Sequence, residues 1–223
     1  MKYDVIIVGA GPGGIYSAYE LMKKCSDKKI AVFDSGYSLK KRHCPIDGEK
    51  VKACIKCKSC SIMSGFGGAG AFSDGKYNIT NDFGGTLYEY IGKKAATELM
   101  QYVDDINMAH GGEGTKMYST AGTNLKKVCL QNRLKLLNAS VRHLGTDINL
   151  VVLGRLYDEL KEHVDFYFES PVSHIECLEN GGYRVWSNDK SYDCEKCIVS
   201  VGRSGSKWME HICKELDIPT KSN

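Results

Sequence analysis

The sequence predicts an α/β fold with a central parallel sheet, and three observations support that prediction. A short apolar strand over residues 3–8 leads into a glycine turn and then into an amphipathic helix. A second apolar strand, residues 30–33, ends at Asp34. Short strand signals return between residues 166 and 201. Since a strand–helix–strand unit places its two strands parallel, we expect the parallel sheet to begin at the N-terminus.

The turn after the first strand has the pattern of a dinucleotide-binding loop. In such a loop Gly9 permits the tight turn, Gly11 lets the backbone approach a pyrophosphate, and Gly14 lets the helix pack close to the sheet. The helix N-terminus offers unpaired N–H groups to phosphates. Asp34 lies 20 residues after Gly14, where an acid bonds ribose hydroxyls and favours a ribose without a 2′-phosphate. The plain alternative is a βαβ unit with a glycine-rich turn. The candidate residues here are Gly9, Gly11, Pro12, Gly13, Gly14, Asp34 and Ser35.

A second glycine-rich segment spans residues 64–75. Glycine at this density costs chain entropy, so close approach of the backbone to a flat or charged group is the natural reason for it. The alternative is a flexible connector. Arg42, soon after the second strand, is a candidate partner for phosphates, and the alternative is a solvated member of a Lys-Lys-Arg run. The glycines of the segment are Gly65, Gly67, Gly68, Gly70 and Gly75.

A cluster of cysteines lies between the two glycine segments. Cys54, Cys57 and Cys60 follow C-x-x-C-x-x-C spacing, and Cys44 stands ten residues earlier, before a proline. Two-residue gaps let thiolates converge on one centre, and Cys-Pro recurs among iron–sulfur ligands. Basic neighbours compensate the charge of such a cluster. We favour an iron–sulfur site, a [4Fe-4S] cluster, with zinc and free thiols as the alternatives. The basic neighbours are Lys40, Lys41, Arg42, Lys50, Lys52, Lys56 and Lys58.

Cys194 and Cys197 form another C-x-x-C pair. We expect Cys197 to begin a strand, in which alternate side chains point to opposite faces. Packed cysteines are therefore favoured over a dithiol switch. The isolated cysteines are interpreted as ordinary buried side chains.

The opening motif and three later segments resemble a known group of proteins. The segments are Cys44-Pro-Ile46, the C-x-x-C-x-x-C run, Gly65–Gly75 and Arg142-His-Leu-Gly-Thr-Asp147. The chain resembles the two-dinucleotide-binding-domain flavoproteins, and within them a poorly characterised group of FAD-dependent dehydrogenases with a Cys-rich insert. The match spans most of the chain and does not select a reaction.

The resemblance implies a Rossmann-like FAD/NAD(P)-binding fold with a central parallel sheet and a small antiparallel β meander as crossover. It also implies that the segment of residues 65–75 lines the isoalloxazine or the pyrophosphate. The late Gly-Asp pair that closes the FAD site in this superfamily does not occur. We therefore expect an N-terminal part of a longer flavoprotein, which alone holds FAD weakly and is completed by a C-terminal segment or chain. The additional cofactor-binding candidates are Gly67, Gly68, Ala69, Gly70, Ser73, Asp74 and Gly202.

Composition limits the other classes of function. The 223 residues carry a net charge of +3, which gives no general signal for nucleic acid or membrane partners. No apolar run is long enough to span a bilayer, and no signal-peptide pattern is present. Ten cysteines without an export signal favour reduced thiols, metal ligation or redox chemistry over a disulfide framework. We expect a cytoplasmic protein.

The predicted organisation has two parts. Residues 1–85 and 171–223 are expected to form the FAD-binding domain, with Cys-rich and Gly-rich loops over 37–75, and residues 86–170 a helical insertion. Helices are expected over 86–109 and from about 146 to 163, with residues 123–141 ambiguous between helix and strand. Strands are expected at 166–168, 172–178, 183–187 and 196–201, with a hairpin turn at 179–182. Arg142, His143, Thr146 and Asp147 form either an anion clamp or a structural helix start, and the structural interpretation is favoured.

The sequence is interpreted as an FAD-dependent oxidoreductase that binds the ADP half of FAD through its N-terminal glycine motif. The cysteine cluster is expected to serve as an electron relay or a structural element. An unidentified redox substrate or electron carrier is its expected partner. The alternatives are a non-catalytic dinucleotide-binding module with structural zinc, and an NAD-dependent enzyme without flavin. The catalytic residues are not predicted.

Overall fold

A computed structural model describes residues 1–179 and 181–221 of the chain, which divides into two compact units. The first unit comprises Met1–Ala71 and Leu156–Asn223, and the second comprises Phe72–Arg155. The predicted domains, 1–85 with 171–223 and an insertion over 86–170, are a functional division that stays a prediction.

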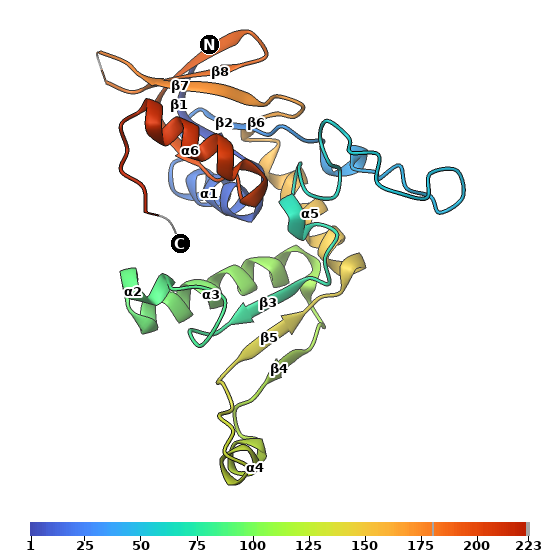
Figure 1. Cartoon of the computed structure of the whole chain (residues 1–223). Coiled ribbons are helices and arrows are strands. Elements are labelled where there is room, and N and C mark those ends of the chain that lie inside the picture. Colours follow the sequence, from blue (N-terminus) through green and yellow to red (C-terminus); the bar gives the residue numbers. More distant parts are fainter. Residues whose placement is uncertain (180, 222–223) are drawn as a thin grey trace. The chain divides into compact units, whose positions relative to one another are not determined.

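The first unit is built on a six-stranded sheet in the order β6-β2-β1-β9-β8-β7 (Figure 1). The first four strands in this order run parallel, while β8 and β7 continue the sheet antiparallel. This arrangement confirms the predicted α/β fold with a mostly parallel sheet and an antiparallel meander. The strands are β1 (Lys2–Val8), β2 (Ile30–Phe33), β6 (Val164–Tyr167), β7 (Val172–Cys177), β8 (Tyr183–Ser187) and β9 (Lys190–Val199).

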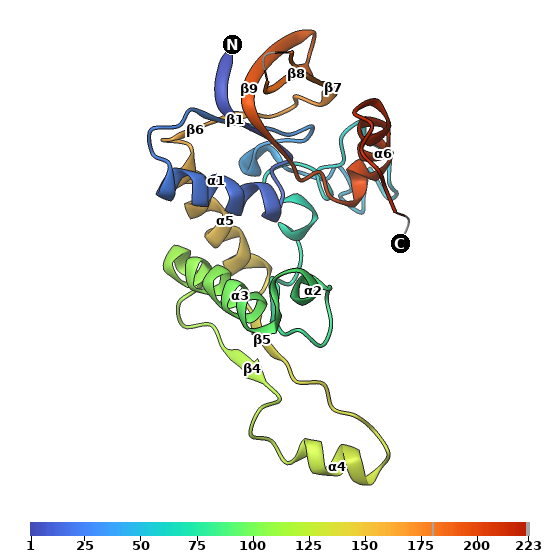
Figure 2. The same ribbon diagram turned by 90° about the vertical axis from the view of Figure 1, so that its left-hand side faces the viewer.

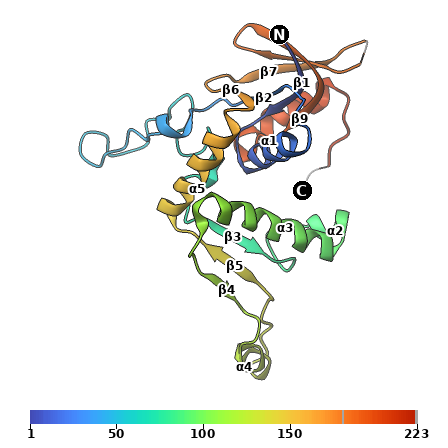
Figure 3. The same ribbon diagram turned by 180° about the vertical axis from the view of Figure 1, so that it is seen from behind.

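The centre of this sheet is buried on both faces, as its apolar sequence requires. Ile6 and Ile7 point to opposite faces and are both fully buried. Helix α1 (Pro12–Lys24) begins against Ile7, while Ile6 packs in one cluster with Ile212 of helix α6 (Ser206–Glu215). Figure 3 shows both helices beside the sheet. The buried positions of α1 recur at helical spacing, which explains why this segment is an amphipathic helix. They are Ile15, Ala18, Tyr19 and Met22.

The first strand contains a local irregularity near its start. The N–H groups of Asp4 and Val5 both donate to the carbonyl of Lys29, at 2.9 and 3.3 Å. Two successive residues opposite one partner are the pattern of a β-bulge, which moves later side chains to the other face. Accordingly Tyr3 and Ile6, three residues apart, pack in the same hydrophobic cluster.

The second unit contains a three-stranded antiparallel sheet in the order β3-β5-β4. Between β4 and β5 the chain makes a long excursion that carries the short helix α4 at its far end (Figure 2). After α3 the chain kinks within Met108–Gly112, where His110 and Gly111 leave the helical region. The elements are β3 (Lys76–Ile79), α2 (Leu87–Ile91), α3 (Lys93–Asn107), β4 (Met117–Ser119), α4 (Leu125–Gln131), β5 (Ser140–His143) and α5 (Thr146–Leu160), whose last turn belongs to the first unit.

Several predicted elements need correction. The single helix expected over 86–109 is broken at Gly92, whose φ of +80° lies outside the helical region. The helix expected to reach residue 163 ends at Leu160. The segment expected to be helical also holds β4 and β5, and β3 was not predicted. The last strand, expected over 196–201, instead spans Lys190–Val199. The hairpin turn at 179–182 includes residue 180, which lies outside the described residues.

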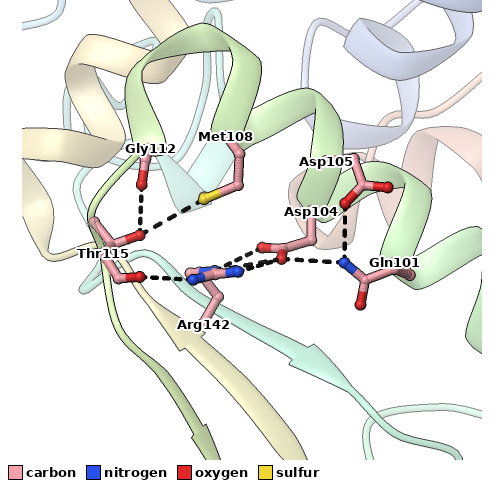
Figure 4. A network of polar contacts seen from close by, with 7 residues as sticks. All are labelled: Gln101, Asp104, Asp105, Met108, Gly112, Thr115 and Arg142. Atoms are coloured by element: carbon pink, nitrogen blue, oxygen red, sulfur yellow. Dashed lines mark hydrogen bonds and ion pairs between the residues drawn. The ribbon is translucent and has the colours of Figure 1, made fainter.

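A buried ion pair joins helix and sheet within the second unit (Figure 4). The Arg142 guanidinium donates to the Asp104 carboxylate from Nε at 3.0 Å and from Nη2 at 2.8 Å, and from Nη1 to the Thr115 carbonyl at 2.6 Å. The Asp104 side chain is 1% exposed and the Arg142 side chain 14% exposed. The hydrogen bond to Asp104 raises the pKa of Arg142 above its usual value. Within the second unit, Arg142 therefore links β5 to α3 through Asp104.

Among the described residues, none of the helices combines the length and the apolar composition needed to cross a bilayer.

Candidate dinucleotide-binding site

Three of the four motif glycines in the turn between β1 and α1 are required by the packing of the turn itself. Gly9 adopts φ +105°, and a side chain there would collide with the carbonyl oxygen of Ser200. A Cβ on Gly13 would overlap the hydroxyl of Ser200, and a Cβ on Gly14 would overlap the carbonyl oxygen of Gly9. Glycine at these positions is thus explained by the close approach of β9 and by the tight start of α1.

Gly11 differs from its neighbours. Its φ of −76° is open to any residue. A Cβ built on Gly11 would meet only the Cα of Gly68, at 3.9 Å, which is ordinary van der Waals contact. Neither conformation nor internal packing therefore requires glycine here, whereas close approach of a ligand to the backbone does provide a reason.

The N-terminus of α1 is suited to an anion. Gly11 is the residue before the helix, Pro12 occupies its first turn, and no side chain caps the free N–H groups. The first turn holds no acid, and the last turn holds Lys23 and Lys24. The positive end of the helix dipole is therefore not neutralised by the helix's own side chains.

Asp34 stands directly after β2, and two backbone N–H groups fix its carboxylate. Ala10 N–H donates to Oδ2 and Gly36 N–H donates to Oδ1, both at 2.7 Å. Asp34 is partly buried, and the next residue, Ser35, is exposed. Since each carboxylate oxygen has two lone pairs, both oxygens can still accept a bond from a hydroxyl group.

The glycine-rich segment is anchored from behind by two buried side chains. Phe66 is fully buried and its ring contacts those of Tyr157 and Phe166 at centroid distances of 5.0 and 5.7 Å. Arg42 is 5% exposed, and its guanidinium donates to the carbonyls of Ser61, Ile62 and Phe66 at 2.8, 2.8 and 2.6 Å. Burial lowers the pKa of Arg42 from its usual value. Arg42 therefore organises the chain around the segment, and its predicted contact with phosphate stays a prediction.

The same segment lies against the turn that begins α1. Gly67 N–H donates to the Ala10 carbonyl at 2.8 Å. Gly68 adopts φ +58°, and a Cβ there would come within 3.1 Å of the Gly11 Cα. The structure thus brings two glycine-rich stretches, 57 residues apart in the sequence, to one place.

The other predicted contact residues are more dispersed. Ala69 and Gly70 continue the segment in a short 3₁₀ helix over Gly68–Gly70, and Gly202, at φ +62°, follows β9. Ser73 and Asp74 belong to the second unit. There the Ser73 hydroxyl accepts a bond from Gly75 N–H, and the Asp74 carboxylate pairs with Lys76 at 2.8 Å, which lowers the pKa of Asp74. Their role toward a cofactor stays a prediction.

The Cys-rich segment is irregular and extends away from the sheet of its own unit (Figures 1 and 3). Cys54, Cys57 and Cys60 are exposed and Cys44 is partly buried. Within residues 1–179 and 181–221, no three His, Cys, Asp or Glu side chains are grouped so as to hold a metal ion. The predicted set of four thiolates therefore does not fit a metal in this arrangement.

Ser200, whose carbonyl and hydroxyl lie against Gly9 and Gly13, was not predicted as part of the site. The signal lies in topology. β9 pairs parallel with β1, and carboxyl ends of parallel strands meet at one edge of a sheet, where this fold class binds ligands. Phe66 was also missed, since an aromatic residue between glycines carries no pattern of its own.

Comparison with known proteins supports the fold. No family model matches the chain. An uncharacterised protein of Clostridium beijerinckii is 24% identical over 217 residues, which cover 96% of this chain and 34% of that protein. Glycine oxidase from Geobacillus kaustophilus matches with a TM-score of 0.53 and 14% identity over 97% of this chain and 58% of its own. L-α-glycerophosphate oxidase from Mycoplasma pneumoniae, with FAD bound, matches with a TM-score of 0.51 and 16% identity over 96% and 57%.

These matches establish the class of fold. The chain has a Rossmann-like α/β fold, which it shares with these two oxidases. It spans about a third of the curated relative that it matches and less than two thirds of each of the two solved structures.

Proposed function

We propose that the chain is the dinucleotide-binding part of an FAD-dependent oxidoreductase. The proposal rests chiefly on Gly11. The fold leaves this position free of conformational and steric constraint, yet it places Gly11 between an uncapped helix N-terminus and the backbone of Gly68. A pyrophosphate beside Gly11 explains all three features together.

The residues of the site fit the ADP half of FAD. The N–H groups at the start of α1 would bind the pyrophosphate, and the Asp34 carboxylate would accept bonds from the ribose hydroxyls. The Gly67–Gly68 backbone would line the same site. The flavin supplies electron transfer when bound, and the protein's contribution is to bind and orient it. The substrate or electron carrier is not specified by these residues.

We expect Gly11→Val to lose dinucleotide affinity without loss of the folded state. The added Cβ meets no atom of the turn closer than 3.9 Å, but the valine side chain occupies the space that a pyrophosphate needs. Loss of two charge-assisted hydrogen bonds weakens binding by about 100-fold or more. Isothermal titration with FAD, NAD and ADP measures the effect, and circular dichroism measures folding. Gly154→Val is the matched control, since no atom lies within 4 Å of a Cβ at Gly154.

Each outcome of this titration separates the candidate functions. Equal affinities of the Gly11→Val and wild-type chains would exclude the glycine turn from the site. A wild-type chain that binds NAD and ADP but not FAD would favour the enzyme without flavin. A non-catalytic module would bind dinucleotide in the titration. In a separate reduction experiment, flavin bound to it would accept electrons from none of the donors tested.

A metal site on Cys44, Cys54, Cys57 and Cys60 is proposed separately, as an electron relay or a structural element. It requires the Cys-rich segment to rearrange around the metal, because the described cysteines do not converge. Each single Cys→Ala variant should then lose iron or zinc nearly as completely as the quadruple variant, since one missing thiolate leaves the coordination sphere incomplete. Metal analysis of anaerobically purified protein is the measurement. A wild-type chain without iron or zinc, or single variants with full metal content, would contradict the proposal.

A further inference from the structure

The excursion that links β4 to β5 is shaped by hydrogen bonds rather than by apolar burial. It comprises residues 120–139 and is called the arm. At its base the Thr120 N–H donates to the Ala139 carbonyl at 3.0 Å, and the Ala139 N–H donates to the Thr120 hydroxyl at 2.9 Å. At its far end the Leu134 N–H donates to the Cys129 carbonyl at 2.8 Å, and no residue of α4 is buried. The arm thus has a defined backbone, while the side chains of α4 lie outside any hydrophobic core.

Five apolar side chains of the arm are exposed. They lie within residues 125–137, and their exposed fractions range from 40% to 63%. Single exposed apolar residues are normal on a protein surface, whereas such a concentration on one protruding segment marks an interaction surface. Figure 2 shows α4 at the end of the arm, away from the three-stranded sheet. The five side chains are those of Leu125, Val128, Leu130, Leu134 and Leu137.

The arm is also strongly basic. It carries four of the 30 Lys and Arg residues of the chain and none of the 27 Asp and Glu residues. The rest of the chain therefore has a net charge of −1, so the net charge of +3 comes from the arm. The overall charge does not reveal this local excess. The four cations are Lys126, Lys127, Arg133 and Lys135, all of them exposed.

An anionic lipid surface matches both properties of the arm. The phosphate headgroups attract the four cations, and the boundary with the acyl chains accepts the leucines. A nucleic acid would pair with the cations but leave the leucines in water, and residues 120–139 contain no aromatic side chain to stack on a base. Contact between two copies through their arms would bring two sets of four positive charges together.

We propose that the arm docks the chain on the surface of a bilayer that contains anionic phospholipid. The five apolar side chains enter the boundary between headgroups and acyl chains. The four cations contact lipid phosphates through their long side chains. Since the arm belongs to the second unit and the glycine turn to the first, docking is a function separate from dinucleotide binding.

Co-sedimentation of the chain with lipid vesicles tests the docking. One set of vesicles is pure phosphatidylcholine, and the other contains about one third phosphatidylglycerol, which is anionic. The chain should sediment with the anionic vesicles and remain in the supernatant with the neutral ones. Binding should weaken in about 1 M salt, because salt screens the attraction between the cations and the lipid phosphates.

Two double variants test the cations and the leucines separately. Lys126→Gln with Lys127→Gln should weaken binding to anionic vesicles by about 25-fold, since each lysine near such a surface contributes a factor of about five. Leu130→Ser with Leu134→Ser should weaken it by about 10-fold or more, because less apolar area enters the bilayer. All four side chains are exposed, so circular dichroism should show an unchanged fold.

Matched controls lie outside the arm. Lys24→Gln with Lys94→Gln removes the same charge from two lysines that each pair with an acid on their own helix. Leu99→Ser with Ile218→Ser removes two apolar side chains that are each 46% exposed. Both control variants should bind anionic vesicles nearly as tightly as the wild type.

Several outcomes would overturn the proposal. They are a chain that sediments with neither kind of vesicle, a chain that sediments equally with both, and arm variants that bind like the controls. A leucine variant with full affinity would show a simple polyanion site instead of docking. A wild-type dimer that the same leucine variant dissociates, measured by light scattering, would assign the arm to a contact between copies.

Discussion

Replacing Arg142 with methionine is expected to destabilise the second unit by about 3–5 kcal/mol, because removal of one partner leaves a buried charge without compensation. Asp104 is 1% exposed and receives two of its hydrogen bonds from Arg142. The Thr115 carbonyl loses its guanidinium donor at the same time. Urea denaturation followed by circular dichroism measures the change in the free energy of unfolding.

Arg184→Met is the matched control for this experiment. Arg184 pairs with Asp193 at 2.6 Å, but the two side chains are 36% and 37% exposed. Solvent screens such a pair, so the loss of stability should be much smaller than for Arg142. Replacing both Arg142 and Asp104 with apolar residues should restore part of the stability, since no unpaired charge is then left. Equal effects of the Arg142 and Arg184 substitutions would contradict the conclusion that the pair of Arg142 and Asp104 is buried.

Replacing Arg42 with methionine is expected to cost about 3 kcal/mol and to weaken dinucleotide binding. The buried carbonyls of Ser61 and Phe66 would lose their donor, and each buried acceptor left unsatisfied costs about 1–3 kcal/mol. The glycine-rich segment would also lose part of its support. The free energy of unfolding and the affinity for FAD or ADP are the two measurements.

The control variants for Arg42 differ in what they retain. Arg42→Lys keeps the charge but cannot reach three carbonyls in a fork, so it should not restore stability. Lys41→Met removes a neighbouring exposed charge, whose ion pair with Glu169 spans 3.6 Å between side chains 71% and 53% exposed, and should change stability little. If Arg42→Met bound ADP as tightly as the wild type, the segment would not contribute to the site.

The parts of the fold that could be predicted were those with local patterns. The strand from residue 3, the turn of Gly9–Gly14 and the helix after it follow from apolar spacing and glycine placement. The break at Gly92 could not be predicted, because the apolar periodicity continues across it while the backbone leaves the helical region. The strand Lys76–Ile79 was missed because its apolar face is short and its partner lies more than 60 residues later.

The candidate site shows the same limit. The glycine motif and Asp34 could be predicted because the local sequence alone explains why each residue is needed at its position. Other features of the site depend on strand order, which a sequence does not state. They are the placement of Gly68 against Gly11, the anchor provided by Phe66 and the contact of Ser200. Arg42 illustrates the remaining difficulty, since a cation near a phosphate motif and a cation that binds carbonyls have the same sequence signature.

The two backbone bonds to Asp34 have a consequence for redesign of cofactor preference. The carboxylate holds Ala10 at the turn before α1 and Gly36 after β2, so it shapes the loops as well as carrying a charge. A neutral or basic residue in place of Asp34, introduced to accept a 2′-phosphate, would remove the repulsion between the carboxylate and that phosphate. It would also remove the two hydrogen bonds that hold the loops. A change of cofactor preference at this position therefore requires two new contacts for the loops as well as the new charge. A single substitution does not provide all of these.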